Sequence, residues 1–351
     1  MRWWATIASS WLALGCTCSD GRAQDAWQFS NRLQVGGEHD DNIYESSRRP
    51  TAAYSGRLLV RSRAEREWSR VQLSLAYSGG LQTYYSFSDE NKLTNEGGAD
   101  LQWRVNRWCR LSGAVQGTLK IYLNGPFDYG TTQSSLQATL QLPRQWLLTM
   151  SVASLRLDYA ESDAFDYLGR TYGLSVRHPL LGSLVGEAGA QGAALRYLRA
   201  VTYQGANFQW VSGGTSQRDR QSSAFVRLML GRRFVVHVTG EFQHNASNSL
   251  GYDYERWRLS LLTAFRVAPR WMVRVAALRQ HKKYTEDLPP IFPIELDTER
   301  NESNFLVGDL SFDLSSDFVW LARVAYYDNE AAVRGLFYQK TLWFSGLEYR
   351  F

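Results

Sequence analysis

The chain has 351 residues, with 39 Lys plus Arg against 34 Asp plus Glu and a net charge of +5. Its mean hydropathy is −0.36, and no apolar run of about 18 residues follows the N-terminal segment, which excludes a bundle of membrane-spanning helices. Aromatic residues nevertheless make up 14% of the chain, with 13 Trp and 19 Tyr. This combination is typical of a transmembrane barrel, whose strands carry apolar residues only at every second position.

The first residues have the pattern of a secretory signal peptide. One basic residue precedes an apolar stretch at residues 3–15 that is too short to span a bilayer. Gly21 and Ala23 are small residues that suit a cleavage site. We therefore expect residues 1–23 to be a cleaved signal peptide and residues 24–351 to form the mature barrel.

Cys16 offers an alternative start as a lipid-modified cysteine, although Ala13 stands where such sites carry Leu. A barrel needs no lipid anchor, so cleavage after Ala23 is the preferred prediction. Cleavage there removes Cys16 and Cys18 and leaves Cys109 as the single cysteine. We therefore expect the sheet, rather than a disulfide, to hold the fold together.

Beyond the leader, short and long breaks alternate along the chain. The seven short breaks are at residues 66–69, 106–108, 143–145, 179–183, 231–233, 268–270 and 315–317. The eight longer polar stretches are residues 37–53, 84–96, 122–131, 159–168, 197–220, 243–254, 280–303 and 327–336. Bacterial barrels have short periplasmic turns and long extracellular loops. With both termini periplasmic, this pattern predicts an all-β, antiparallel up-and-down transmembrane barrel of about 16 strands, with 14 or 18 as alternatives.

The segments between the breaks alternate in polarity. In residues 256–267, for example, Trp257 and Leu259 share one face and Arg256 and Arg258 share the other. Aromatic residues follow or end six of the short breaks, namely Trp68, Trp108, Trp146, Phe234, Trp271 and Phe318. Tyrosines mark the opposite ends, namely Tyr44, Tyr54, Tyr84, Tyr122, Tyr159, Tyr197, Tyr254 and Tyr284. We expect both sets to form girdles at the two membrane interfaces.

The last segment alternates up to the final residue. Phe351, Tyr349 and Leu347 lie on one face, and Arg350 and Glu348 lie on the other. This tail resembles the C-terminal strand of bacterial outer-membrane barrels, whose terminal aromatic is read by the barrel-insertion machinery. The resemblance implies that Phe351, Tyr349 and Leu347 form the assembly signal.

If apolar faces point to lipid, most strand charges point into the lumen, and the predicted inward set has 18 basic and 8 acidic residues. A barrel of this size is wide enough for an aqueous passage, and rings of Arg and Lys favour anions. The arginines predicted to face passing anions are Arg61, Arg63, Arg104, Arg110, Arg227, Arg256, Arg258, Arg266 and Arg274. The alternative is that these arginines fill the lumen structurally, paired with carboxylates.

The sequence gives little support to enzymatic or cofactor chemistry, so we expect no enzyme, no catalytic residue and no cofactor. The chain has 5 His, and His244 with Ser247 lacks the surroundings of a catalytic pair. The acidic segment around His39 has the oxygen ligands that calcium prefers, but its spacing is not that of an EF-hand. A solvated acidic turn is the preferred interpretation. No metal site is therefore assigned. The apolar centre of the 280–303 stretch, Ile291–Ile294, is expected to fold inward or to dock on a partner.

The same acidic segment carries a family resemblance. Glu38-His39-Asp40-Asp41-Asn42-Ile43 is similar to the E-x-D-[DS]-N-[VI] opening of the putative β-barrel porins of proteobacteria, with His39 in place of the more usual Tyr. Members of this group are often linked to exopolysaccharide export or to surface assembly. The resemblance implies a barrel in such a system and assigns no functional residue.

The expected protein is therefore a channel of the Gram-negative outer membrane with periplasmic termini. The preferred function is a passive conduit for export of an anionic polysaccharide. The alternatives are a general anion-preferring porin and a structural sheath or anchor for a surface complex. Expected partners are membrane lipid, lipopolysaccharide, the insertion machinery and periplasmic export or surface-complex proteins, with no nucleic acid.

Overall fold

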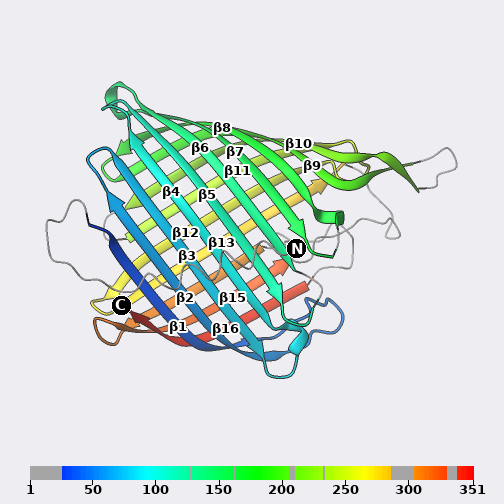
Figure 1. The fold of residues 1–351 in the computed structure, drawn as a ribbon, viewed down its shortest axis with the longest axis horizontal. Coiled ribbons are helices and arrows are strands. Elements are labelled where there is room, and N and C mark those ends of the chain that lie inside the picture. Colours follow the sequence, from blue (N-terminus) through cyan, green and yellow to red (C-terminus); the bar gives the residue numbers. More distant parts are fainter. Residues whose placement is uncertain are drawn as a thin grey trace.

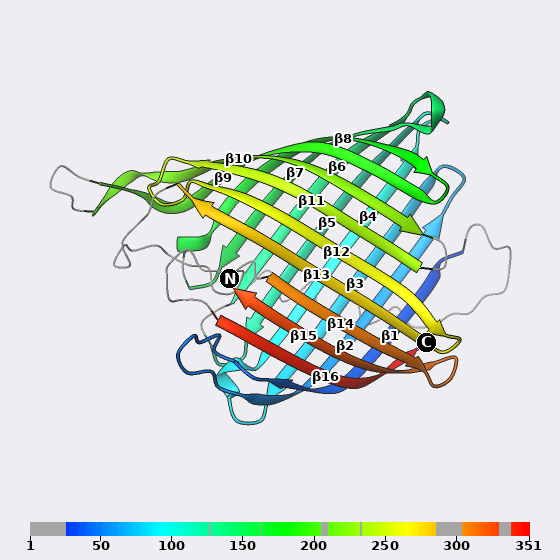
Figure 2. The same ribbon diagram turned by 180° about the vertical axis from the view of Figure 1, so that it is seen from behind.

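The computed structural model describes residues 26–125, 128–161, 163–204, 210–231, 234–285, 304–329 and 338–351. Within these residues, sixteen antiparallel strands close into one barrel, in which each strand pairs with its neighbours in the chain and β1 pairs with β16 (Figures 1 and 2). The predicted 16-stranded up-and-down barrel is therefore confirmed. The predicted signal peptide, with its alternative at Cys16, and the apolar centre Ile291–Ile294 lie outside the described residues.

The first eight strands are β1 (Gln28–Asp40), β2 (Ala53–Glu67), β3 (Val71–Tyr84), β4 (Lys92–Arg104), β5 (Cys109–Tyr122), β6 (Tyr129–Gln141), β7 (Leu147–Tyr159) and β8 (Tyr167–Leu181). The last eight are β9 (Leu184–Gln204), β10 (Trp210–Gly231), β11 (Phe234–Ser247), β12 (Tyr254–Ala268), β13 (Trp271–Tyr284), β14 (Asn304–Asp313), β15 (Phe318–Asn329) and β16 (Tyr338–Arg350). Three single-turn 3-10 segments interrupt the connections, namely η1 (Ser88–Glu90), η2 (Pro143–Gln145) and η3 (Asp163–Phe165). In the described part of the chain, no helix is long and apolar enough to cross a membrane.

The strands form because their residues alternate between two environments. On the outward face large apolar side chains are exposed, as at Leu136 (65%), Val226 (56%) and Leu259 (56%). The opposite face carries the ion pairs that join neighbouring strands, such as Arg177 with Glu187. An exposed apolar surface of this extent suits a wall whose outer neighbour is lipid.

All seven short breaks fall where they were predicted, but the strands run further into the polar stretches at the other end of the barrel. The largest correction concerns residues 197–220, which were predicted to be a loop. There β9 continues to Gln204 and β10 begins at Trp210, so the two strands project from the barrel as a long hairpin (Figures 1 and 2). Polar residues can continue these strands, because the hairpin extends beyond the membrane and its outward face does not contact the acyl chains of the lipid.

The tyrosines at the loop end correct a second expectation. Tyr84, Tyr122 and Tyr159 are only 5–9% exposed and lie on the lumen face, whereas a girdle would place them against lipid. Tyr54, at 65% exposed, does lie on the outer face. The predicted outer girdle at the loop end is therefore wrong for the buried tyrosines, because they occupy positions that alternate onto the lumen face of their strands.

The barrel closes where β1 meets β16. Gly36 lies opposite Gly346 in this ladder, and the ring of Phe344 covers both from the lumen side. A Cβ added at Gly36 would lie 2.4 Å from the carbonyl oxygen of Ser345 and 2.6 Å from the Phe344 ring. This close approach of backbone and ring requires glycine on both strands.

Candidate functional site

The nine arginines predicted to face anions all lie on the lumen face of the described strands. Four of them take part in ion pairs: Arg63 with Glu65, Arg227 with Glu187, Arg256 with Glu241, and Arg274 with Asp309. For the remaining five, no ion pair with another described residue is found; they are Arg61, Arg104, Arg110, Arg258 and Arg266. The lumen therefore combines the two alternatives left open by the sequence, and attraction of anions by these residues stays a prediction.

The ion pairs use one carboxylate to join two or more strands. Glu187 on β9 accepts Arg177 of β8 at 2.8 Å and Arg227 of β10 at 3.3 Å. Asp309 on β14 likewise accepts Arg323 of β15 at 2.6 Å, and Arg274 of β13 binds it from the other side. Each carboxylate is more buried than its arginines, whose side chains stay 37–51% exposed. Such pairs fix neighbouring strands and still leave guanidinium groups in contact with water.

The arginines without an ion pair are arranged differently. Arg104 on β4 lies directly opposite Arg110 on β5, and Arg61 on β2 lies directly opposite Arg32 on β1. Like charges facing each other across a strand pair destabilise the sheet unless water or an anion screens them. These positions are therefore the parts of the wall best suited to attract mobile anions.

At the loop end, tyrosines form an inward-facing layer that the sequence prediction placed on the wrong face. The members are Tyr84, Tyr122, Tyr129, Tyr159, Tyr167, Tyr197, Tyr254, Tyr284 and Tyr338, and we call them the tyrosine collar. Neighbouring rings pack against one another, with centroids 5.3 Å apart for Tyr129 and Tyr159 and 5.8 Å apart for Tyr254 and Tyr284. The collar thus gathers aromatic rings on the inner side of this mouth, and Tyr84, Tyr122, Tyr159 and Tyr338 are buried there.

Basic side chains lie over the faces of these rings. Lys120 is 4.7 Å from the ring centroid of Tyr122 and 5.7 Å from that of Tyr129, and Lys282 is 5.0 Å from that of Tyr254. A cation over an aromatic face is held by the quadrupole of the ring. The collar therefore places aromatic rings and positive charge side by side.

Polar side chains at the start of the following strand hold the collar in place. Three backbone N–H groups each donate to one such oxygen: Tyr84 to Asn91 Oδ1 at 2.6 Å, Tyr122 to Asp128 Oδ1 at 2.7 Å and Tyr159 to Asp166 Oδ1 at 2.7 Å. Burial raises the pKa of the Asp166 carboxyl, against the opposing effect of this hydrogen bond. The recurring pattern fixes the backbone at the end of β3, β5 and β7.

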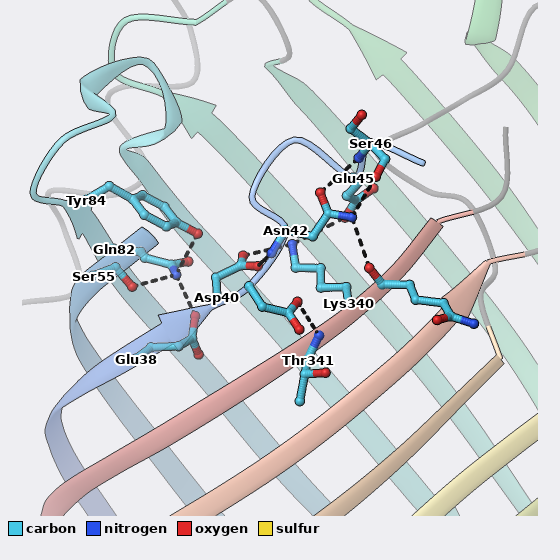
Figure 3. Close-up of polar contacts among 12 residues, drawn as sticks. Glu38, Asp40, Asn42, Glu45, Ser46, Ser55, Gln82, Tyr84, Lys340 and Thr341 are labelled. Carbon is cyan, nitrogen blue, oxygen red and sulfur yellow. Dashed lines mark hydrogen bonds and ion pairs between the residues drawn. The ribbon is translucent and has the colours of Figure 1, made fainter. Parts of the chain in front are cut away.

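The acidic segment at the end of β1 forms a buried network rather than a solvated turn (Figure 3). Asp40 is 1% exposed and binds Lys340 of β16 at 2.9 Å. Asn42, also 1% exposed, donates to the carbonyl oxygens of Ser46 and Gln339 at 3.0 and 2.9 Å. The segment therefore joins the first strand to the last at the mouth of the barrel.

Glu38 extends this network toward the lumen. It accepts hydrogen bonds from Arg57 at 2.5 Å and from Gln82 at 2.7 Å. The Gln82 amide also donates to Ser55 and to the hydroxyl of Tyr84 (Figure 3). The network thus connects the barrel seam to the tyrosine collar. Its carboxylates are committed to Lys, Arg and amide donors, and the preferred solvated-turn interpretation is wrong because those partners come from other strands.

The predicted assembly residues lie on the outer face of the seam. Phe351, Tyr349 and Leu347 are 60, 38 and 48% exposed, and the rings of Tyr349 and Phe351 stack with centroids 5.3 Å apart. The backbone of Phe351 exchanges two hydrogen bonds with Asn31, at 3.0 and 3.1 Å, and so completes the ladder. Recognition of these residues by the insertion machinery stays a prediction.

The structure separates the two residues considered for catalysis. His244 lies opposite Glu255 with its side chain on the outer face of β11, and Ser247, three positions later, is on the inner face. The backbone N–H of Ser247 is held by the Asp253 carboxylate at 2.5 Å. His244 and Ser247 therefore cannot act together as base and nucleophile.

The family resemblance is supported by comparison with known families. Residues 26–156 match the family model described as "Putative beta-barrel porin 2", a region that runs from β1 into β7. The match includes the buried acidic segment. No curated protein matches the chain.

Several solved structures have a similar fold. One titled "Bacterial polysaccharide outer membrane secretin" is 7% identical, with 92% of this chain and 98% of that chain covered and a TM-score of 0.44. In-vitro folded OmpT of Vibrio cholerae is 10% identical (94% and 99% covered, TM-score 0.47), and OccAB3 of Acinetobacter baumannii is 12% identical (93% and 99% covered, TM-score 0.46). At these identities and TM-scores the likeness carries no information on substrate. The closed barrel and the family match indicate a channel of the bacterial outer membrane.

Proposed function

We propose that this channel is a passive conduit for export of an anionic polysaccharide, with its termini in the periplasm and its loops outside. The observation that carries the proposal is the tyrosine collar with basic groups over its rings. Neither an aromatic lining nor a cation alone would select a charged sugar polymer. Their combination at one mouth is what supports this substrate class.

The chemistry of such a polymer matches both parts of the collar. Sugar rings have apolar C–H faces that pack on aromatic rings, and acidic sugars add carboxylate or sulfate groups that bind Lys and Arg. Because ring stacking depends little on the sequence of the units, several equivalent positions around the mouth suit a chain that slides. Weak, repeated contacts of this kind allow release as well as entry.

The lumen below the collar supports an anionic cargo. The arginines at Arg61, Arg104 and Arg110 face one another or another arginine across strand pairs. A low-dielectric wall concentrates the field of such groups in the passage and raises the local concentration of anions. An anionic polymer would therefore meet a favourable potential before it reaches the collar.

Two alternatives each have an observation in their favour. A general anion-preferring porin is favoured by the water-exposed lumen arginines, such as Arg63 with a side chain 61% exposed. A structural sheath for a surface complex is favoured by the long β9–β10 hairpin, which projects beyond the barrel (Figure 1). Neither alternative requires sugar recognition at the collar.

The test is conductance in planar bilayers with added oligosaccharides. We expect a hexamer of uronic acid to block the ion current at concentrations at least about tenfold below those of a neutral glucose hexamer, since each charged contact adds about 1 kcal/mol or more. Tyr254→Leu combined with Lys282→Gln should remove this preference, because both side chains are only partly buried and Lys282 lies 5.0 Å from the ring centroid of Tyr254. Tyr54→Leu combined with Arg48→Gln is the matched control, because Tyr54 is 65% exposed on the outer face and Arg48 lies in an exposed loop.

Three outcomes would count against the conduit. Block by small inorganic anions alone, with no effect of either hexamer, would favour the porin. A barrel that is inserted but never conducts would favour the sheath. Equal block by the uronic and the glucose hexamer would contradict the assignment of an anionic cargo.

A further inference from the structure

The outer face of the barrel carries a concentrated basic surface at the loop end of four neighbouring strands. Its members are Arg156 on β7, Arg170 on β8, Arg196 on β9, and Arg218 and Arg220 on β10, all of them exposed. We call them the arginine patch. They share the outward parity of their strands with exposed apolar residues nearer the turn end, namely Val152, Tyr172, Leu174, Val226 and Leu228.

The strand register brings these arginines into two adjacent rows. Arg196 lies directly opposite Arg218, and the next row runs from Arg170 through Ala194 to Arg220. Residues opposite one another in an antiparallel pair have Cβ atoms about 4.5–5.5 Å apart. Four guanidinium groups therefore arise from an area only three strands wide.

Few acidic groups balance this charge. Asp158 binds Arg156 at 3.1 Å, and both side chains are more than half exposed. Arg196 donates to the hydroxyl of Ser216 at 3.4 Å. In the described residues, no carboxylate is paired with Arg170, Arg196, Arg218 or Arg220.

Elsewhere at the loop end of the described strands, outward charge is absent or balanced: on β13, Arg279 pairs with Asp328 at 3.4 Å and Lys283 lies opposite Glu255. The corresponding outward positions on β2 to β6 are uncharged, and include Tyr54, Thr83, Leu93, Ile121 and Gly130. Like charges placed opposite one another destabilise a sheet when nothing neutralises them. The concentration of arginines on one side therefore points to an anion that lies against the outer wall there.

The level of the arginine patch indicates which anion this is. On β8 and β10 the arginines lie on the loop side of the exposed apolar residues Tyr172 and Val226, and Leu168 and Leu198 are exposed beyond them on β8 and β9. At that level a membrane changes from acyl chains to headgroups. Guanidinium groups bind phosphate oxygens in a bidentate manner and with little desolvation, which makes arginine the preferred partner of lipid phosphates.

We propose that the arginine patch is a binding site for the phosphate groups of the glycolipid that forms the outer leaflet. The site uses Arg170, Arg196, Arg218 and Arg220 as phosphate ligands, and Arg156 lies at its edge. Bound lipid would neutralise the facing charges and tie one side of the barrel to the surrounding leaflet. The inference rests on the loops facing outside and is independent of what the lumen transports.

The test uses the full chain folded in detergent micelles and titrated with diphosphoryl lipid A, with bound lipid counted by native mass spectrometry. Arg170→Gln, Arg196→Gln, Arg218→Gln and Arg220→Gln are combined in one variant. The matched control combines Arg48→Gln, Arg49→Gln, Arg107→Gln and Arg144→Gln, which removes the same charge from exposed loop and turn positions. We expect the patch variant to bind at least about tenfold more weakly than the native chain, at about 1 kcal/mol for each arginine near an anionic surface, and the control to bind normally.

Two further arms keep the proposal falsifiable. Replacing the four arginines by lysine should restore part of the binding, because charge is kept while bidentate geometry is lost. If the quadruple glutamine variant does not fold, Arg196→Gln with Arg218→Gln alone should give a smaller loss in a heat-modifiable barrel. Native-like binding by the glutamine variant, an equal loss in the control, or displacement of lipid A by millimolar inorganic phosphate would each overturn the lipid assignment. Conductance is measured separately, so failure here leaves the proposed conduit untouched.

Discussion

At the scale of single residues, Asn42 shows how a polar side chain can close a barrel. Its amide donates to carbonyl oxygens on both sides of the seam, and its Oδ1 accepts the N–H of Ser46 at 2.9 Å. Asp40 and Asp41 add contacts to Lys340 and to the N–H of Thr341. The seam is therefore latched at its loop end by side chains of one short segment.

Replacing Asn42 by alanine should destabilise the barrel. The change removes three hydrogen bonds in a site that is 1% exposed, and leaving buried groups unsatisfied costs about 1–3 kcal/mol. The measurement is the urea midpoint of unfolding in lipid vesicles. Asn248→Ala is a control of the same chemistry at an exposed loop position, where we expect a smaller shift. An unchanged midpoint in Asn42→Ala would refute the latch.

The role of this segment could not be predicted from sequence. Local spacing shows only that Glu38, Asp40 and Asp41 are acidic and close together, which is equally typical of a solvated turn and of a cation site. What decides the matter is Lys340, about three hundred residues away, which the closed barrel brings to 2.9 Å from Asp40. Contacts between residues so far apart in the sequence cannot be predicted from local sequence patterns.

At the scale of the strand, alternation predicts the face of each residue up to the strand ends, whereas polarity does not predict where the strands end. The tyrosine collar was missed although its parity was readable: Leu119 and Ile121 face outward, so Tyr122 belongs to the lumen face. The preference of aromatic residues for membrane interfaces pointed to the outer face, whereas the alternation of positions points to the lumen. Likewise β9 and β10 extend further than predicted because a wall above the lipid needs no apolar face.

The terminal strand gives a prediction on assembly. Changing Phe351 to Asp should reduce insertion, because it places a charge in lipid beside Tyr349 and next to the closing pair with Asn31. The readout is the amount of heat-modifiable protein in the outer membrane relative to total synthesis. Phe234→Asp is the matched control, since Phe234 is an outward aromatic at the same end, 47% exposed, on an internal strand. Equal yields of both variants would contradict a special role of the last strand.

The loops and turns give a prediction on orientation. A protease site inserted at Tyr85, which is 82% exposed and lies just beyond β3, should be cleaved on intact cells. The same site inserted at Arg144, in the short connection between β6 and β7, should be protected until the cells are opened. Tyr85 avoids Asn91, whose side chain holds the end of β3. Cleavage at Arg144 on intact cells would reverse the topology.

At the scale of the whole molecule, the lumen contains two kinds of arginine with different roles. Those shared with Glu187 and Asp309 fasten strands to one another, whereas Arg104 and Arg110 face each other with no described carboxylate paired to either. The sequence predicted the face on which all of these lie but could not sort them, because pairing depends on register between strands. The register is what assigns each arginine to stability or to the potential of the passage.

This division predicts separable effects on selectivity and stability. Arg104→Gln with Arg110→Gln should lower the anion preference of the conducting barrel, measured as reversal potential in a salt gradient. The free energy of unfolding from urea titration should stay within about 0.5 kcal/mol of the native value. The loss should fade as salt rises, because the screening length falls from about 8 Å at physiological ionic strength to about 3 Å at 1 M. Arg274→Gln should do the reverse, since it releases Asp309 from one of its two arginines and lowers the midpoint while removing a charge that was already balanced. Arg107→Gln, exposed in the turn beside Arg110, is the control for a charge at the same mouth but outside the wall. A native reversal potential in the Arg104/Arg110 variant, or cation preference in the native barrel, would show that the passage is governed by groups other than the arginines without ion pairs.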